Sequence, residues 1–228
     1  MSNQRGRPRS FDEEAALDRA MRVFWEQGFE PTSINDLTDA MGIALSSLYT
    51  AFGSKRTLFA QAVEHYQAQF GMDVPAMFDE ATTAREGVSA MLHTAARTYA
   101  DPSHPPGCLI ISAASNCGAQ AADVRADLRQ RRERNISAMA DRIATDVTAG
   151  LLPPDTDPRA LANFYAAVLQ GMSQRARDRA TEAELHTIAD TAMLAWPRTH
   201  RDGRIAAVQL DEAFAVVSVE GDGQGKDD

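Results

Sequence analysis

The sequence contains few cysteines, few aromatic residues and no long apolar run. Its 228 residues include two cysteines, and aromatic residues make up 7% of the chain. Two cysteines cannot supply the disulfide framework of a small secreted domain, and they suit a reducing compartment. The lack of any run of about 18 apolar residues argues against a transmembrane helix. The basic N-terminus leads into an amphipathic segment rather than an apolar signal core, so we expect a cytoplasmic protein.

Motifs of the common catalytic and cofactor sites are also missing. The chain has no glycine-rich phosphate loop, no Gly-x-Ser-x-Gly elbow and no His-Glu-x-x-His pair. Its five histidines are scattered, and no Cys or His cluster has the spacing of a metal site. We therefore expect no enzyme, no metal and no other cofactor. Burial is the expected role of the Cys108 and Cys117 thiols, with redox sensing as the alternative.

Net charge is −9, which at first argues against a nucleic-acid partner. The distribution of the charge matters more, because the acidic excess lies mostly after residue 60. An acidic body would repel non-specific DNA and leave binding to a few placed contacts.

Apolar side chains recur at helical spacing along most of the chain. Alanine is abundant, and alanine-rich segments with little valine favour helix over strand. We predict an all-α fold with helices over residues 12–27, 33–41, 45–52, 57–70, 76–81, 86–99, 119–149, 157–177 and 182–196. The apolar stretch 107–114 fits either a buried strand or a buried helix. Residues 198–228 have no clear pattern, and their end is expected to be disordered.

The most informative stretch is residues 33–59. Ser33 is a good N-cap, because its hydroxyl can accept an orphan backbone N–H. Gly42 can adopt the left-handed conformation that ends a helix, and a second short apolar phase then runs to Gly53. Ser54 can cap the next helix. Two short helices joined by a tight glycine turn are typical of a helix-turn-helix, which places its second helix in the DNA major groove. A pair of ordinary core helices is the alternative.

The second of these helices, residues 45–52, is expected to have two faces. A buried stripe would consist of the residues at i, i+3, i+4 and i+7, namely Leu45, Leu48, Tyr49 and Phe52. The other face would present small side chains, namely Ser46, Ser47, Thr50 and Ala51. Hydroxyl and methyl groups of this size can approach base edges closely.

This stretch resembles the DNA-binding domain of TetR-type bacterial transcription regulators. The matching residues are Thr32-Ser33-Ile34, Asp36-Leu37, Met41-Gly42-Ile43, Leu48-Tyr49, Phe52, Ser54-Lys55 and Leu58-Phe59. The resemblance implies a flexible basic arm over residues 1–10, a three-helix helix-turn-helix domain over 11–56, and a helical effector-binding and dimerisation domain over 57–197.

The resemblance further implies a function. The protein would be a homodimeric repressor, with its last two helices at the dimer interface, and a small-molecule effector would release it from DNA. Its operator would be palindromic double-stranded DNA with half-sites about 34–36 Å apart. A helical protein-interaction module without DNA binding is the alternative.

Individual residues receive roles from the same resemblance. The arginines of the arm, Arg5, Arg7 and Arg9, would enter a narrow minor groove. Contacts to the DNA backbone would come from Thr32, Ser33, Tyr49 and Lys55, with the Tyr49 ring kept in the core and its hydroxyl on a phosphate. Bases would be read by Ser46, Ser47 and Thr50, in a DNA-facing segment that also contains Ala44 and Leu45. Ala44 replaces the usual capping Ser or Asn, and a lost cap costs about 0.5–2 kcal/mol.

Aromatic and methionine side chains of the body mark a candidate effector pocket. These residues are Phe70, Met91, Tyr99, Phe164, Tyr165 and Met172. The alternative is that they form plain core, as such stripes often do.

Overall fold

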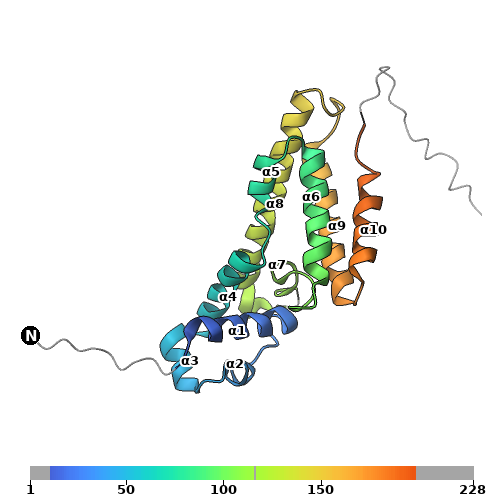
Figure 1. Cartoon of the computed structure of the whole chain (residues 1–228). Coiled ribbons are helices and arrows are strands. Elements are labelled where there is room, and N and C mark those ends of the chain that lie inside the picture. The colour runs from blue at the N-terminus through green and yellow to red at the C-terminus, as the bar shows by residue number, and fades with distance from the viewer. Residues whose placement is uncertain (1–10, 116, 199–228) are drawn as a thin grey trace, which may run out of the picture.

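The computed structural model describes residues 11–115 and 117–198 of the chain. Every regular element within these ranges is a helix, which confirms the predicted all-α fold (Figure 1). In chain order the elements are α1 (Glu13–Gln27), α2 (Ile34–Met41), α3 (Leu45–Phe52), α4 (Lys55–Gln69), α5 (Val74–Glu80), α6 (Ala84–Ala100), α7 (Leu109–Ser112), the short 3-10 helix η1 (Ala119–Ala121), α8 (Ala122–Thr148), α9 (Pro158–Arg177) and α10 (Glu182–Met193).

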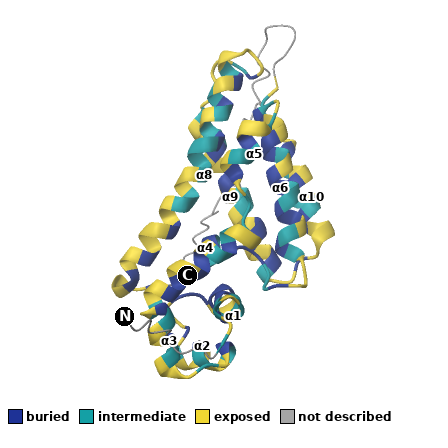
Figure 2. Ribbon diagram, turned by 60° about the vertical axis from the view of Figure 1, so that its left-hand side comes forward, coloured by how far each residue is buried: buried dark blue, intermediate teal, exposed yellow. Residues whose placement is uncertain are grey.

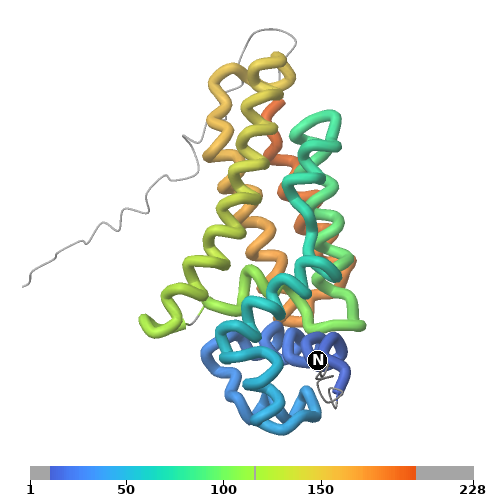
Figure 3. Tube along the Cα trace, turned by 90° about the vertical axis from the view of Figure 1, so that its left-hand side faces the viewer, coloured from blue at the N-terminus to red at the C-terminus, as the bar shows by residue number. Residues whose placement is uncertain are grey.

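The helices form a small head and a taller body. α1, α2 and α3 make up the head at one end of the molecule, and α5 to α10 make up the body (Figure 1 and Figure 3). α4 packs along α1 and carries the chain from the head into the body. Within the body, α8 packs against α5 and α9, while α6 packs against α9 and α10. The predicted arm, with Arg5, Arg7 and Arg9, and the tail beyond residue 198 lie outside the described residues.

Side-chain caps fix where the head helices begin. The Asp12 carboxylate accepts hydrogen bonds from two backbone N–H groups in the first turn of α1. Ser33 begins α2 as predicted: its hydroxyl accepts from the Asp36 N–H, and the Asp36 carboxylate accepts from the Ser33 N–H at 2.8 Å. Ser54 begins α4 through the same reciprocal pairing with Thr57. Each cap satisfies N–H groups that a helix otherwise leaves unpaired.

The apolar stretch 107–114 is neither a strand nor a long helix. Gly107 has φ +80°, and a Cβ built on it would lie 2.7 Å from the carbonyl oxygen of Ser173 and 2.9 Å from its Oγ. The chain therefore passes close to α9 at Gly107, and the helix that follows, α7, has four residues. The thiols of Cys108, at the start of α7, and Cys117 are both buried, as expected.

Gly107→Ala is expected to lower the free energy of unfolding by about 2–4 kcal/mol, because it combines a left-handed φ with a clash against the backbone of α9. Gly150→Ala is the matched control. Gly150 also has a left-handed φ, +73°, but no atom of the described part of the chain lies within 4 Å of its Cβ position, so we expect a loss of about 1 kcal/mol. Urea unfolding followed by circular dichroism measures both losses. Equal losses would show that the approach of Gly107 to α9 carries no strain.

Trp25 joins the head to the body. Its ring is fully buried, and its centroid lies 4.7 Å from that of Tyr66 on α4 and 4.6 Å from that of the His104 ring. Next to it, the Arg177 guanidinium on α9 donates to the backbone carbonyls of Trp25 and Glu26. These contacts tie α1 to both α4 and α9, so the body positions the head.

Candidate nucleic-acid interface

A left-handed glycine sets the angle between α2 and α3. Gly42 has φ +68° and ψ +35°, and its N–H donates to the Thr38 carbonyl at 2.9 Å. Arg19 on α1 donates from Nη1 to the Met41 carbonyl at 2.9 Å, which holds the end of α2 against α1. The predicted helix–glycine–helix unit is thus present, and it lies at the end of the molecule away from the body (Figure 1).

The predicted buried stripe of α3 is correct for two residues and wrong for two. Leu48 and Phe52 are buried, whereas Leu45 and Tyr49 are each 49% exposed. α3 packs against α2 and α4, and Leu48 and Phe52 lie one turn apart on that contact. Leu45 and Tyr49 lie outside that contact. The Tyr49 ring is predicted to lie in the core, but it is half exposed.

α3 consequently exposes both apolar and small polar residues, and Figure 2 colours parts of its ribbon as exposed. Its exposed residues are Leu45, Ser46, Tyr49 and Thr50, with Ser47 half-buried beside them. The Thr50 hydroxyl donates to the Ser46 carbonyl at 2.7 Å, which leaves its oxygen lone pairs free to accept. No residue of α3 is charged, so nothing on the helix repels a phosphate.

The start of α3 has no side-chain cap. Ala44 occupies the N-cap position with φ −70° and ψ 151°, and it makes no side-chain hydrogen bond to the first turn. This outcome follows from the lack of an acceptor on alanine, as the sequence predicts. The first N–H groups of α3 are therefore open to water or to an anion.

The two residues at the start of α2 that were expected to reach the DNA backbone differ in their exposure. Ser33 is exposed, and its hydroxyl caps α2. Thr32 is 1% exposed, and its hydroxyl donates to the Gly28 carbonyl at 2.7 Å. The Thr32 hydroxyl therefore holds the end of α1, and the DNA contact expected of Thr32 stays a prediction.

Lys55 turns back toward the junction of head and body. Its Nζ donates to the Glu30 carbonyl at 3.2 Å and lies 4.6 Å from the centroid of the Phe29 ring. Burial lowers the pKa of the Lys55 ammonium, and the nearby Cys117 and Glu30 oppose that shift. The predicted phosphate contact of Lys55 stays a prediction, and the two other N–H groups of the ammonium can still donate to a phosphate.

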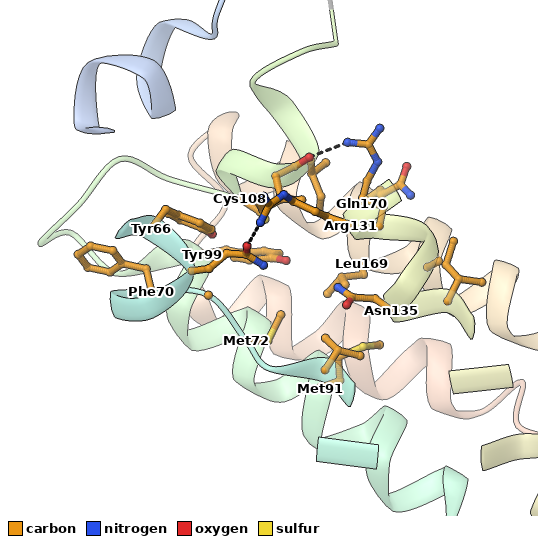
Figure 4. Close-up of a pocket in the computed structure, with 18 of the residues that line it drawn as sticks. Tyr66, Phe70, Met72, Met91, Tyr99, Cys108, Arg131, Asn135, Leu169 and Gln170 are labelled. Carbon is orange, nitrogen blue, oxygen red and sulfur yellow. Dashed lines mark hydrogen bonds between the residues drawn. The ribbon is translucent and has the colours of Figure 1, made fainter. Parts of the chain in front are cut away.

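A second candidate site is a cavity in the body, with an empty volume of about 750 Å³ including its mouth (Figure 4). Phe70, Met91 and Tyr99 line it, as the sequence predicts. In Figure 4, Arg131 and Asn135 of α8 face the aromatic rings of α4 and α6 across the cavity.

Three predicted pocket residues do not line this cavity. Phe164 is 43% exposed on the surface of α9. Met172 and Tyr165 are buried, and the Tyr165 hydroxyl donates to the Ala192 carbonyl at 3.2 Å. The structure therefore does not bring these three residues together with Phe70, Met91 and Tyr99, because periodic apolar positions on α9 face different neighbours.

Sequence reasoning also missed several lining residues, namely Tyr66, Cys108, Arg131, Arg132 and Asn135. Burial raises the pKa of Tyr66 and of Tyr99 well above the ordinary phenol value, and the neighbouring Cys108 thiol adds to both shifts. Both phenols are therefore neutral hydrogen-bond donors at physiological pH.

Within residues 11–115 and 117–198, no helix combines the length and apolar character that a membrane span requires. In the same ranges, no group of three or more His, Cys, Asp or Glu side chains could hold a metal ion.

Comparisons with known proteins match both parts of the chain. Residues 16–62 match the family model described as bacterial regulatory proteins, tetR family, and residues 82–192 match the model of the tetracyclin repressor-like C-terminal domain. The HTH-type transcriptional repressor ComR of Escherichia coli (strain K12) is 31% identical over 198 residues, which cover 86% of this chain and 94% of that protein. The repressor BdcR of the same organism is 28% identical over 76% of this chain and 83% of its own length.

One solved structure has the same architecture and is bound to DNA. It is a cysteine mutant of the TetR family transcriptional regulator CifR in complex with a 26-bp double-strand operator. It is 41% identical to this chain with a TM-score of 0.78, and the match covers 84% of this chain and 100% of that one.

Proposed function

The chain belongs to the TetR family of bacterial regulatory proteins, and we propose that it represses transcription as a homodimer with one α3 in each half of a palindromic operator. Binding to DNA as a transcriptional regulator follows from the family and from the relative solved with its operator. The exposed face of α3 is the observation that carries the proposal for this chain. Leu45 and Tyr49, on a helix of eight residues, are both half exposed and so contribute little burial to folding. Exposed apolar side chains of this kind are typical of a surface that binds a partner.

Each part of this face suits a different part of a major groove. Ser46, Ser47 and Thr50 offer hydroxyls to base edges, and the Thr50 methyl fits a thymine methyl. The open N–H groups that follow Ala44 suit a phosphate. The Tyr49 hydroxyl is proposed to donate to a second phosphate, with its exposed ring lying along the sugar backbone.

A second copy of the chain is proposed to pack on α9 and α10. Phe164, Ala167 and Gly171 are exposed at i, i+3 and i+7 along α9, which gives one apolar stripe with small residues that let helices approach. Leu194, at the end of α10, is 74% exposed. Large apolar side chains left open together are typical of an interface.

Effector release is proposed to act through the segment between the cavity and the head. Ile110 lines the cavity, and three residues later the Ala113 carbonyl accepts from the Phe29 N–H at 2.7 Å. At the end of the segment, the Arg56 guanidinium of α4 pairs with Asp123. A ligand that shifts α7 would therefore move contacts of the head, with a coupling free energy of about 1–3 kcal/mol.

We propose no catalytic activity, because the similar proteins are regulators and the cavity lacks a nucleophile–base pair. A cytoplasmic location is proposed because the similar proteins are transcriptional repressors. A helical interaction module without DNA binding would leave the exposed α3 face unexplained.

Selection of bound sites from random duplexes tests the proposal. We expect enrichment of an inverted repeat whose half-sites are one helical turn apart, about 34–36 Å, or a multiple of it. Enrichment of no motif at low ionic strength would reject DNA binding, and an asymmetric motif would reject the proposed dimer.

Tyr49→Phe is expected to weaken binding to the selected operator and to unrelated duplexes alike, by about tenfold, because a hydrogen bond to a charged phosphate is lost. The slope of affinity against salt should not change, since the phenol carries no charge. Tyr165→Phe is the matched control, because it removes the same hydroxyl from a buried site in the body. Fluorescence anisotropy of labelled duplexes measures the affinities. An unchanged affinity for Tyr49→Phe would remove the proposed phosphate contact.

A further inference from the structure

The cavity in the body has an apolar floor and a positively charged wall. Its apolar lining includes Phe70, Met72, Met91, Met139 and Leu169, contributed by several helices (Figure 4). Its polar lining comes from tyrosines, amides and two neighbouring arginines of α8. Among residues 11–115 and 117–198, no aspartate or glutamate lines the cavity. The charged side chains that line the cavity are therefore both arginines.

The two arginines differ in how their charge is balanced. Arg131 pairs with Glu64 at 2.6 Å and with Asp127 at 2.9 Å, so two carboxylates neutralise its guanidinium. Arg132 donates from Nη1 to the Ile110 carbonyl at 2.6 Å and forms no ion pair with any residue in 11–115 or 117–198. It is half-buried, and burial lowers the pKa of its guanidinium. A partly desolvated charge of this kind gains most from an anionic partner.

We propose that the effector of this cavity is a small carboxylic acid with an apolar or aromatic body, bound as its anion to Arg132. This inference rests on the proposed function, because it names the ligand class of the proposed effector site. The carboxylate accepts from the free nitrogens of Arg132, and the Asn135 amide provides a neighbouring donor. The apolar body lies on the methionines, whose flexible side chains adapt to its shape.

The same contact offers a route to the head. Arg132 donates to the Ile110 carbonyl of α7, and the Ala113 carbonyl just after α7 accepts from the Phe29 N–H. An anion that draws the Arg132 guanidinium into the cavity competes with the Ile110 carbonyl for its N–H groups. The anion therefore acts on the segment that holds the head, whereas a neutral ligand of the same shape does not.

Matched ligand pairs test the charge requirement directly. Octanoate is compared with octanol, and naphthoate with naphthol, by isothermal titration calorimetry of the full chain at neutral pH. We expect at least one acid to bind about tenfold more tightly than its alcohol, the size of a charge-assisted hydrogen bond. Equal binding of both members of each pair, or no binding of any of the four, would overturn the proposal.

Variants of Arg132 assign the preference to one residue. Arg132→Gln should remove the preference for the acid, and Arg132→Lys, which keeps the charge, should retain most of it. Arg134→Gln is the control, because Arg134 is exposed two residues further along α8 and does not line the cavity. A preference that survives Arg132→Gln would overturn the assignment, and the wild-type pairs still decide the ligand class if that variant does not fold.

Operator binding separates this inference from the proposed function. All variants are measured on the selected operator with and without the acid, and the acid should weaken binding by the wild type about tenfold. A chain that binds the acids but no DNA would reject the regulator and leave the ligand class standing. A chain that binds the operator but shows no preference for the acids would reject the ligand class alone.

Discussion

Replacement of Thr50 with glutamate is expected to lower operator affinity by at least about a hundredfold, because it places a carboxylate on the α3 face that meets the DNA. No residue of α3 carries a charge, and Thr50 is exposed there. A carboxylate set against phosphates and base acceptors costs several kcal/mol, and each 1.4 kcal/mol corresponds to a factor of about ten. Fluorescence anisotropy on the selected operator measures the loss.

Thr145→Glu provides the control for this substitution. Thr145 is exposed on α8 in the body, and its hydroxyl donates to the Asp141 carbonyl four residues back, just as the Thr50 hydroxyl donates to the Ser46 carbonyl. The chemical change is therefore the same at a site away from the head. Operator affinity should stay within about twofold of the wild type, a difference of a few tenths of a kcal/mol. A hundredfold loss in Thr145→Glu, or none in Thr50→Glu, would show that α3 is not the reading surface.

Trp25→Ala is expected to lower the free energy of unfolding by about 3–5 kcal/mol, because it empties a fully buried site between head and body. The lost contacts include the edge-to-face packing on Tyr66 and the stacked His104 ring. Since a domain of this size is stable by only about 5–15 kcal/mol, the variant should lose much of its stability. Urea unfolding followed by far-UV circular dichroism measures the loss.

Trp25→Phe separates the packing of this residue from its polar group. The Trp25 Nε1 atom is buried and has no hydrogen-bond partner among the residues that the structure describes, so phenylalanine removes volume but none of the described hydrogen bonds. We expect a loss of about 1–2 kcal/mol for this variant, well below that of Trp25→Ala. Equal losses for the two variants would mean that the aromatic packing of Trp25 contributes little to joining head and body.

Local signals in the sequence predict the helices and their ends well. Ser33 and Ser54 cap α2 and α4, and Gly42 adopts the left-handed turn, because each of these choices depends on side chains within a few residues. The sequence of segment 107–114 fits both a strand and a helix for the opposite reason. Its course is set by the close approach of Gly107 to Ser173 on α9, which is distant in sequence.

Burial on a short helix is harder to predict than the helix itself. The spacing of Leu45, Leu48, Tyr49 and Phe52 fits one apolar stripe, but an eight-residue helix contacts its neighbours over a narrower strip. Only Leu48 and Phe52 lie on that strip. The burial prediction is wrong for Leu45 and Tyr49, and the exposure of these two residues supports α3 as a binding surface.

The contacts of the candidate site residues also depend on neighbours that the sequence does not reveal. Thr32 and Lys55 match the family pattern, but their side chains are engaged by Gly28 and Glu30. Phe164 continues the apolar pattern of α9, and the sequence of one chain does not say which face a second copy covers. α8 contains arginines and carboxylates close together in the sequence, among them Asp127, Arg131 and Arg132. In the folded chain, Arg132 of α8 lies against the Ile110 carbonyl, a contact between distant segments that the sequence alone does not predict.

The proposed pair of α3 helices is tested most directly by the stoichiometry and affinity of binding to a duplex with two half-sites and to one with a single half-site. We expect two chains per two-site duplex by native mass spectrometry, and scrambling of one half-site should lower affinity at least about a hundredfold. One chain per duplex, or equal affinity for the two duplexes, would mean that the protein does not read its operator with two copies of α3.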